Sequence, residues 1–302
     1  MDSGNTTNYK GSSEVKLLAA GLLFSVLWPS AAVATKIGLQ VAQPFVICIA
    51  RFFVAGVLML VITHGVLRNR LPQKEEWKQI AMYGLLNISL YLGLYVLAMQ
   101  YISPGLGSLA IAANPVFISL MSAIFFKQRT GAGIFISLVL CIVGILIAAT
   151  PLLQKSFATP GGLLILLLSM LIYSGGTIYF SRKSWHGLHI LTINGWQTLL
   201  GGIFLLPVAA LTFHPAQNTW NMKFIGSVLW LAIPVSIVAV QVWLYMLRDN
   251  AVKASFWLFL CPLAGFLIAH FTTHEPLTLY TLVGMLLVLF GLYISQKRKK
   301  LN

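Results

Sequence analysis

The sequence predicts an all-α integral membrane protein with ten transmembrane helices, arranged as two inverted five-helix repeats. Three observations predict this fold class. Of the 302 residues, 58% are hydrophobic and 9% are charged, whereas about a quarter of an ordinary soluble domain is charged. Ten apolar stretches are long enough to cross a bilayer. The first five stretches also match the last five in order, which indicates an internal duplication.

The predicted spans follow one another with short connections. A membrane helix needs about 20 mainly apolar residues. The stretches of this kind are 15–36, 42–66, 79–100, 104–126, 131–152, 161–181, 189–212, 224–247, 254–273 and 277–296. The chain therefore divides into an N-terminal tail (1–14), a first repeat (15–152), a second repeat (161–296) and a basic tail (297–302).

The basic residues predict the orientation of the chain. The net charge is +14, but the charges are spread over short loops and do not form a nucleic-acid-binding face. With a cytoplasmic N-terminus, 16 of the 20 Lys and Arg residues fall on the inner side, and Lys155 and Lys223 fall outside. Cytoplasmic loops carry an excess of Lys and Arg. We therefore predict a multi-pass protein of the cytoplasmic membrane with both termini inside.

The first span also has a feature of a signal peptide. Residues 32–34 read Ala-Val-Ala, which resembles a cleavage site after an apolar run. The run is long and matches a later segment that cannot be a signal. We expect it to be retained as the first span.

The three cysteines predict no disulfide and no metal site. Cys48, Cys141 and Cys261 lie in different spans and form no CxxC motif. Single buried cysteines behave as small apolar residues. We expect no cofactor.

The internal repeat is clearest around two prolines. Pro262 lies 147 residues after Pro115, and at the same offset Gly291 matches Gly144 and Glu275 matches Gln128. Each half contains five spans, and an odd number makes the second copy enter from the opposite side of the membrane. Inverted repeats are common in secondary transporters, although channels and membrane enzymes are also duplicated.

Several stretches resemble the EamA-type repeats of the drug/metabolite transporter superfamily. The first repeat opens with GLLFSVLWPSAAVATKIGL and IARFFVAGVLML, and it closes with LAMQYISPGLGSLAIAANPVFISLMSAIFFKQRTGAGIFISLVLCIVGILI. The second closes with YMLRDNAVKASFWLFLCPLAGFLIAHFTTHEPLTLYTLVGMLLVLFGLYI. The resemblance covers almost all of residues 15–296. Such proteins usually have Glu just after the fourth span, where this chain has Gln128, so any role of that acid is in doubt in the first repeat.

The resemblance implies a ten-helix transporter whose central cavity is lined by spans 1, 3, 4, 6, 8 and 9. Spans 5 and 10 would close the rear. Members commonly export amino acids, other small metabolites or drugs, so the expected partners are a small-molecule solute and the lipid bilayer. The resemblance fixes neither the solute nor the oligomeric state.

Polar residues in spans 3 and 8 are candidates for solute binding. Asn87 and Tyr91 lie centrally in span 3 and four residues apart, which places them on one helix face. Gln241 and Tyr245 have the same spacing in span 8. A buried amide can bind a solute, but it can equally bond to a neighbouring helix.

Spans 1 and 6 carry helix-weakening residues at matching positions. Span 1 has Trp28-Pro29-Ser30, and span 6 has Tyr173-Ser174-Gly175-Gly176. Interrupted spans in corresponding positions point to a transporter site, and the aromatic rings offer flat faces to a solute. We therefore predict Trp28, Ser30, Tyr173 and Ser174 as binding residues and Pro29, Gly175 and Gly176 as hinges.

The two matched prolines predict hinges in spans 4 and 9. A proline inside a helix removes one hydrogen bond and frees the carbonyl four residues earlier, which is Ile111 for Pro115 and Leu258 for Pro262. In a membrane these carbonyls need another partner. Asn114, directly before Pro115, joins the predicted binding residues.

Arg51 is the one charged residue deep in a span. An arginine at mid-membrane is costly and needs a partner or a path to water. Arg51 can reach water, bond to carbonyls of span 1 or meet a substrate carboxylate, and the resemblance favours a structural role. The six acidic residues all lie near span ends or in loops, so the sequence leaves open whether transport is ion-coupled.

Two other functions compete with a transporter. A channel-like facilitator would need no coupling ion. A membrane enzyme would need catalytic groups, but the spans lack a carboxylate pair, an HExxH motif and a P-loop. We therefore predict a non-enzymatic secondary transporter that works by alternating access.

Overall fold

The computed structural model describes residues 6–125, 132–154, 157–243, 245–246 and 257–298, and every regular element in these ranges is helical. The elements are α1 (Thr6–Gly38), α2 (Pro44–Leu60), η1 (Val61–Val66), α3 (Lys74–Gly84), η2 (Leu85–Leu92), α4 (Gly93–Ala98), α5 (Pro104–Phe125), α6 (Ala132–Gln154), α7 (Pro160–Arg182), α8 (Ile190–Thr212), η3 (Pro215–Gln217), α9 (Met222–Trp230), η4 (Leu231–Ala239), α11 (Leu260–Thr273) and α12 (Leu279–Arg298). The predicted all-α class is confirmed. Gln128, which the sequence matches to Glu275, lies outside these residues.

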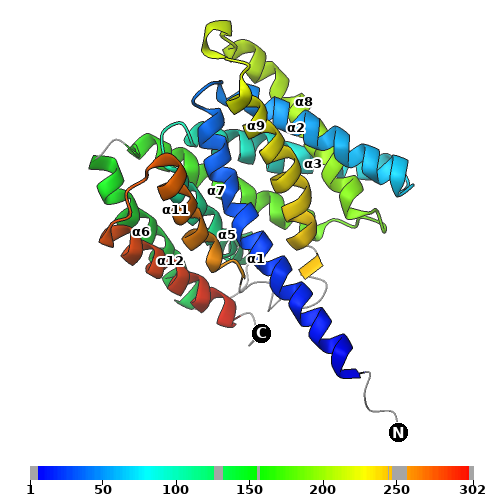
Figure 1. Ribbon diagram of the computed structural model, residues 1–302. Coiled ribbons are helices and arrows are strands. Elements are labelled where there is room, and N and C mark those ends of the chain that lie inside the picture. Colours follow the sequence, from blue (N-terminus) through cyan, green and yellow to red (C-terminus); the bar gives the residue numbers. More distant parts are fainter. Residues whose placement is uncertain (1–5, 126–131, 155–156, 244, 247–256, 299–302) are drawn as a thin grey trace.

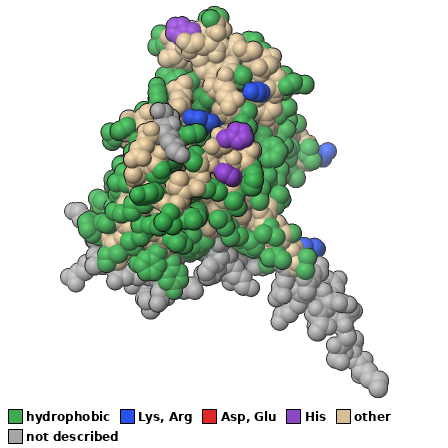
Figure 2. All heavy atoms as spheres, turned by 60° about the vertical axis from the view of Figure 1, so that its left-hand side comes forward, with side chains coloured by type: hydrophobic (Ala, Val, Ile, Leu, Met, Phe, Trp, Pro, Cys, Tyr) green, Lys and Arg blue, Asp and Glu red, His purple; other side chains and the backbone are tan. Residues whose placement is uncertain are grey.

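Eight helical segments of the described chain are long and apolar enough to cross a membrane. Two further apolar helices, Leu260–Thr273 and Leu279–Ser295, are shorter. Large apolar side chains face outward, for example Leu211 and Phe271, and apolar atoms cover most of the face seen in Figure 2. In water this surface would be costly. The chain is a multi-pass membrane protein.

The helices form one bundle in which distant segments of the chain lie side by side (Figure 1). On one side α6 packs along α12, and on the other α2 packs along α8. Between these pairs, α1 contacts α9 and α11, while α5 contacts α7 and α11. Each half of the chain therefore contributes helices to every part of the bundle.

The contact between α6 and α12 depends on glycines. A Cβ atom on Gly144 would lie 2.6 Å from the carbonyl oxygen of Gly284, and one on Gly291 would lie 2.8 Å from that of Ser137. Such distances leave no room for a side chain, so the backbones touch. Nearby, the Cys141 thiol lies 3.8 Å from the carbonyl oxygen of Val288, which is 147 residues later in the sequence. This separation equals the offset between the two predicted repeats. The two glycine contacts are related by the same offset. Gly291 lies 147 residues after Gly144, and Gly284, which contacts Gly144, lies 147 residues after Ser137, which contacts Gly291.

Two helices contain π-helical segments at matching places. The segment η2 interrupts the helix formed by α3 and α4, and η4 follows α9 about 147 residues later. Pro234 lies within η4, where its missing N–H and bulky ring disfavour regular α-helical bonding. The Ser236 hydroxyl donates to the Leu231 carbonyl at 2.8 Å. Such π segments are frequent at functional sites.

The two matched prolines occupy different places in their helices. Pro115 lies within α5, but α11 begins at Leu260, so Pro262 lies in its first turn. A proline there costs no helical hydrogen bond, because the first N–H groups have no partner in the helix. The Leu258 carbonyl accepts a hydrogen bond from the Cys261 N–H at 3.3 Å. The expectation of a free carbonyl at Leu258 is therefore wrong.

Candidate solute-binding site

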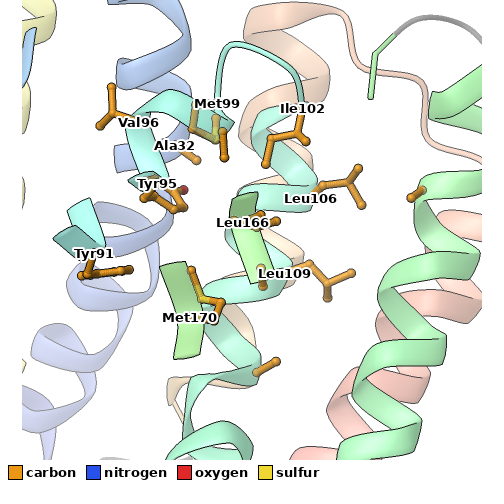
Figure 3. Close-up of a cluster of buried hydrophobic side chains, with 14 of the residues drawn as sticks. Ala32, Tyr91, Tyr95, Val96, Met99, Ile102, Leu106, Leu109, Leu166 and Met170 are labelled. Carbon is orange, nitrogen blue, oxygen red and sulfur yellow. The ribbon is translucent and has the colours of Figure 1, made fainter. Parts of the chain in front are cut away.

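Three tyrosines from three helical segments form an aromatic cluster inside the bundle. The ring centres of Tyr91 and Tyr173 are 4.7 Å apart, and those of Tyr91 and Tyr95 are 6.2 Å apart. Figure 3 shows Tyr91 and Tyr95 on one side of a cluster of buried apolar side chains that includes Met170. Helix spacing places Tyr91 and Tyr95 on the same face of their span. The cluster offers flat apolar surfaces next to hydroxyl groups.

Asn114 lies beside this cluster. It comes from α5, its side chain is buried, and its Oδ1 atom makes no hydrogen bond with any described group. Its amide interacts with the hydroxyl of Tyr91. The Tyr95 hydroxyl is likewise buried and lacks a partner among the described residues. Buried polar atoms without partners are unusual and costly, which makes this place a candidate for a solute.

A chain of polar side chains crosses the bundle next to the tyrosines. The Asn87 amide donates to Gln197 Oε1 at 3.3 Å, and the Gln197 amide donates to Asn194 Oδ1 at 2.8 Å. Asn194 Nδ2 lies 3.5 Å from the Ser236 carbonyl. Arg51 donates to the Ser236 hydroxyl. The chain thus links η2 and α2 of the first half with α8 and η4 of the second.

Arg51 ends this chain deep inside the protein. Only 6% of its surface is exposed. Its Nε and Nη2 atoms both lie 3.2 Å from the Ser236 Oγ, and Tyr91 and Tyr95 lie within electrostatic range of the guanidinium. The serine supplies one acceptor and no charge. Arg51 therefore remains a buried cation without an acidic partner in the described part of the chain.

The two central amides predicted from the sequence, Asn87 and Gln241, are not hydrogen-bonded to each other. Asn87 bonds to Gln197 and not to Gln241. The Gln241 Nε2 atom is buried and makes no hydrogen bond to the described residues. Tyr245 is 49% exposed. The structure thus brings Tyr91, Asn114 and Tyr173 together, but it places Tyr245 at the outer surface of its helix.

The predicted residues of span 1 pack in another part of the bundle. Trp28 packs against Phe24 with tilted rings whose centres are 5.4 Å apart, in a cluster that includes Cys261 of α11. The Ser30 hydroxyl accepts a hydrogen bond from the Trp230 indole at 2.9 Å. Pro29 is buried against Gly265 and Ser108. These contacts join α1 to α9, α5 and α11.

The predicted residues of span 6 lie close to the polar chain. Ser174 is fully buried and donates to the Met170 carbonyl at 2.9 Å. A Cβ atom on Gly176 would lie 3.4 Å from Leu86 Cβ, whereas one on Gly175 would meet open space. A side chain at Gly176 would therefore meet η2 at an ordinary contact distance, and one at Gly175 would meet no atom within 4 Å.

Sequence reasoning missed Asn194, Gln197 and Ser236. Asn194 and Gln197 are three residues apart in an apolar span, so they share a helix face. This spacing is the same type of signal that identified Asn87 and Tyr91. Gln197 also lies 146 residues after Arg51, at the equivalent repeat position, which would have drawn attention to it.

A first cluster at the helix ends joins the two halves through Glu275. This Glu275 cluster consists of Glu275, Ser103, Gly105 and Lys36. The buried carboxylate accepts from the Ser103 hydroxyl at 2.6 Å and from the Gly105 N–H at 2.9 Å, which caps the N-terminus of α5. Lys36 donates to the Met99 carbonyl at 2.8 Å. Burial raises the pKa of Glu275, and these hydrogen bonds oppose the rise.

A second cluster joins the halves through Arg70. This Arg70 cluster consists of Arg70, Glu76, Gln73 and His186. Arg70 binds the Glu76 carboxylate through two hydrogen bonds of 2.7 Å and donates to the His186 carbonyl at 2.9 Å. The Gln73 N–H also donates to Glu76. Hydrogen bonding to Glu76 raises the pKa of Arg70, which stays charged.

The geometry defines a class of protein: a multi-pass membrane bundle with polar groups of both halves buried at its centre. The family model of the EamA-like transporter family matches residues 16–150 and 160–296. The chain therefore belongs to this family.

Two of three similar proteins are also called transporters. An uncharacterized transporter of Archaeoglobus fulgidus is 28% identical, covering 90% of this chain and 95% of its own. Uncharacterized transporter YvbV of Bacillus subtilis is 25% identical, covering 92% and 90%. Protein PecM of Dickeya dadantii is 26% identical, covering 91% and 93%. The names point to a transporter rather than to an enzyme.

A solved crystal structure is similar over 95% of this chain and 98% of its own, with a TM-score of 0.63 and 18% sequence identity. At this identity the likeness concerns the fold alone.

Proposed function

We propose that this protein is a secondary transporter that exports amino acids or similar small metabolites or drugs across the cytoplasmic membrane. The observation that carries the proposal is the polar chain from Asn87 to Arg51, which crosses between the halves inside an apolar bundle. Polar residues inside a membrane are costly and usually mark a solute pathway. The tyrosines and Asn114 beside the chain supply further binding groups.

In this proposal residues 15–152 and 161–296 form two inverted five-helix repeats that exchange roles during transport. The recurrence of contacts between α6 and α12 at the 147-residue offset supports the repeat. So do the π segments η2 and η4 in matching helices. The site between the repeats would face one side of the membrane and then the other.

The Glu275 and Arg70 clusters would act as the two gates. Each joins a residue of one half to a residue of the other, through Glu275 with Ser103 and through Arg70 with His186. With both termini in the cytoplasm, the Glu275 cluster lies at the outer surface and the Arg70 cluster at the inner surface. The bias of 16 basic residues against two supports this orientation.

Flux into proteoliposomes tests the proposal. Purified protein should move a subset of labelled amino acids and small metabolites with a rate that saturates as their concentration rises. Asn87→Leu and Gln197→Leu should each lower the flux, because they break the polar chain. Absence of flux for every solute above empty liposomes would contradict the function.

A channel-like facilitator is the second candidate. Its support is the absence of a carboxylate among the described central side chains, since Glu76 and Glu275 lie at helix ends. Coupled carriers generally use intramembrane acids or histidines. Flux that rises linearly without saturation and without dependence on pH would favour this alternative.

A further inference from the structure

We propose that Arg51 binds the carboxylate of the transported solute, so that the site takes small organic carboxylates and rejects cationic drugs. This inference rests on the proposed transport function and narrows its substrate class. It concerns one place in the bundle, where Arg51 of α2 lies within electrostatic range of Tyr91 and Tyr95. Asn114 interacts there with Tyr91.

Arg51 has no counter-charge among the residues that the structure describes. The described acidic side chains are Glu75, Glu76 and Glu275, and none of them pairs with Arg51. Glu76 is bound by Arg70, and Glu275 by Ser103 and Gly105. A buried arginine normally has an anionic partner. A carboxylate on the solute would supply it.

The hydrogen-bonding capacity of Arg51 is only partly used. The guanidinium has five N–H donors, and those on Nε and Nη2 are directed to the single Ser236 oxygen. The Nη1 atom donates to no residue that the structure describes. Two parallel N–H donors of an arginine match the two oxygens of a carboxylate.

The position in the second half that matches Arg51 is occupied by a neutral residue. Gln197, 146 residues after Arg51, is buried like Arg51, but both ends of its amide are bonded, to Asn87 and to Asn194. The same place in the fold is thus filled by a neutral, fully bonded side chain. A charge is therefore not needed to pack this position. In the first half, the charge of Arg51 has a role other than packing.

Polar groups that interact with Arg51 or with Tyr91 also lack partners among the described residues. The Tyr95 hydroxyl and Asn114 Oδ1 are buried without partners. The hydroxyl can donate to a carboxylate, and Oδ1 can accept from an N–H of the solute. The rings of Tyr91 and Tyr173 would cover its apolar part. Together these groups can hold a small carboxylate. Among the residues that the structure describes, no acidic side chain bonds to Arg51, Tyr95 or Asn114 Oδ1, so an amine would have no anionic partner from them.

Binding to the detergent-purified full chain tests the site without requiring transport. The probes are matched pairs that differ only in the carboxylate: L-leucine with L-leucinamide, and benzoate with benzamide. Inorganic phosphate serves as a third anion. At least one carboxylate should raise the melting temperature in a saturable way, since ligands stabilise the state that binds them. Its amide should bind at least about tenfold more weakly.

The variants Arg51→Gln and Arg51→Lys locate the effect. Arg51→Gln should fold, because it removes an unpaired buried charge. Carboxylates should no longer raise the melting temperature of this variant. Arg51→Lys should keep part of it. Arg68→Gln, which removes an exposed arginine, is the matched control and should bind as the wild type does.

The binding experiments either support or overturn a carboxylate site at Arg51. Equal binding of acid and amide, equal binding of phosphate, no binding of any carboxylate, or full binding by Arg51→Gln would overturn the carboxylate site. If Arg51→Gln fails to fold, the acid and amide pairs on the wild type and on Arg51→Lys still decide. Carboxylate binding without flux in proteoliposomes would contradict the transport function but not the carboxylate site. Flux of amines alone would contradict the carboxylate site but not the transport function.

Discussion

The Glu275 and Arg70 clusters perform the same task with different chemistry. Each connects the two halves at helix ends, and each contains one buried carboxylate. Glu275 is held by a hydroxyl and a backbone N–H, whereas Glu76 is held by a partly exposed arginine that forms two hydrogen bonds. The first is a helix cap made from a distant loop, and the second is an ion pair at the protein surface.

This difference predicts how each connection can be opened. A cap made of buried hydrogen bonds is little affected by salt, but it responds to protonation of its carboxylate. A partly exposed ion pair is weakened by salt. The two ends of the proposed pathway should therefore respond to different conditions.

The largest effect is expected from Glu275→Leu. The change leaves the Ser103 hydroxyl and the Gly105 N–H buried without an acceptor, which should cost about 3 kcal/mol of unfolding free energy. Thermal unfolding in detergent measures the loss. Glu75→Leu, at an exposed position, is the control and should change stability little. Equal stability of both variants would show that Glu275 does not hold the halves together.

A smaller effect is expected from Arg70→Gln. The arginine is partly exposed, so screening by water reduces its contribution to stability. Its loss nevertheless leaves the buried Glu76 carboxylate with the hydrogen bond from the Gln73 N–H at 2.7 Å in place of an ion pair. The melting temperature should fall less than in Glu275→Leu. Added salt should lower the melting temperature of the wild type toward that of the variant. A salt-independent difference between them would contradict an ion pair.

The smallest effect is expected from Glu275→Gln. Because burial raises the pKa of Glu275, the folded protein binds this proton more tightly than the unfolded chain does. The unfolding free energy should therefore be highest below the ordinary Glu pKa and fall as pH rises through the raised pKa. Glu275→Gln, which stays neutral, should lose this part of the pH dependence. Identical pH profiles of variant and wild type would contradict the raised pKa.

Much of the fold could be predicted because membrane helices are encoded locally. Hydropathy gave the all-α class. The repeat offset aligned Gly144 with Gly291, but only the structure shows that both glycines lie in the contact of α6 with α12. The start of α11 was harder to predict, because an apolar stretch does not show where a helix begins. This is why Pro262 was expected inside its helix and lies in the first turn.

The site was only partly predictable for a different reason. Helix spacing shows which residues share a face, as for Asn87 and Tyr91, but not which helix that face meets. The bonds from Asn87 to Gln197 and from Arg51 to Ser236 join residues 110 and 185 positions apart. Only the packing of α2, α8 and η4 brings them together. Tyr245 shares a spacing with Gln241, yet it lies exposed at the edge of the bundle.

Cross-linking each cluster during transport tests the central claim most directly. In a chain whose native cysteines are replaced by alanine, one variant carries Ser103→Cys with Glu275→Cys, and another carries Arg70→Cys with His186→Cys. A short reducible cross-linker should stop saturable flux in proteoliposomes in both variants, and reduction should restore it, because each cluster must open once per cycle. Undiminished flux in either fully cross-linked variant would contradict alternating access through these two clusters.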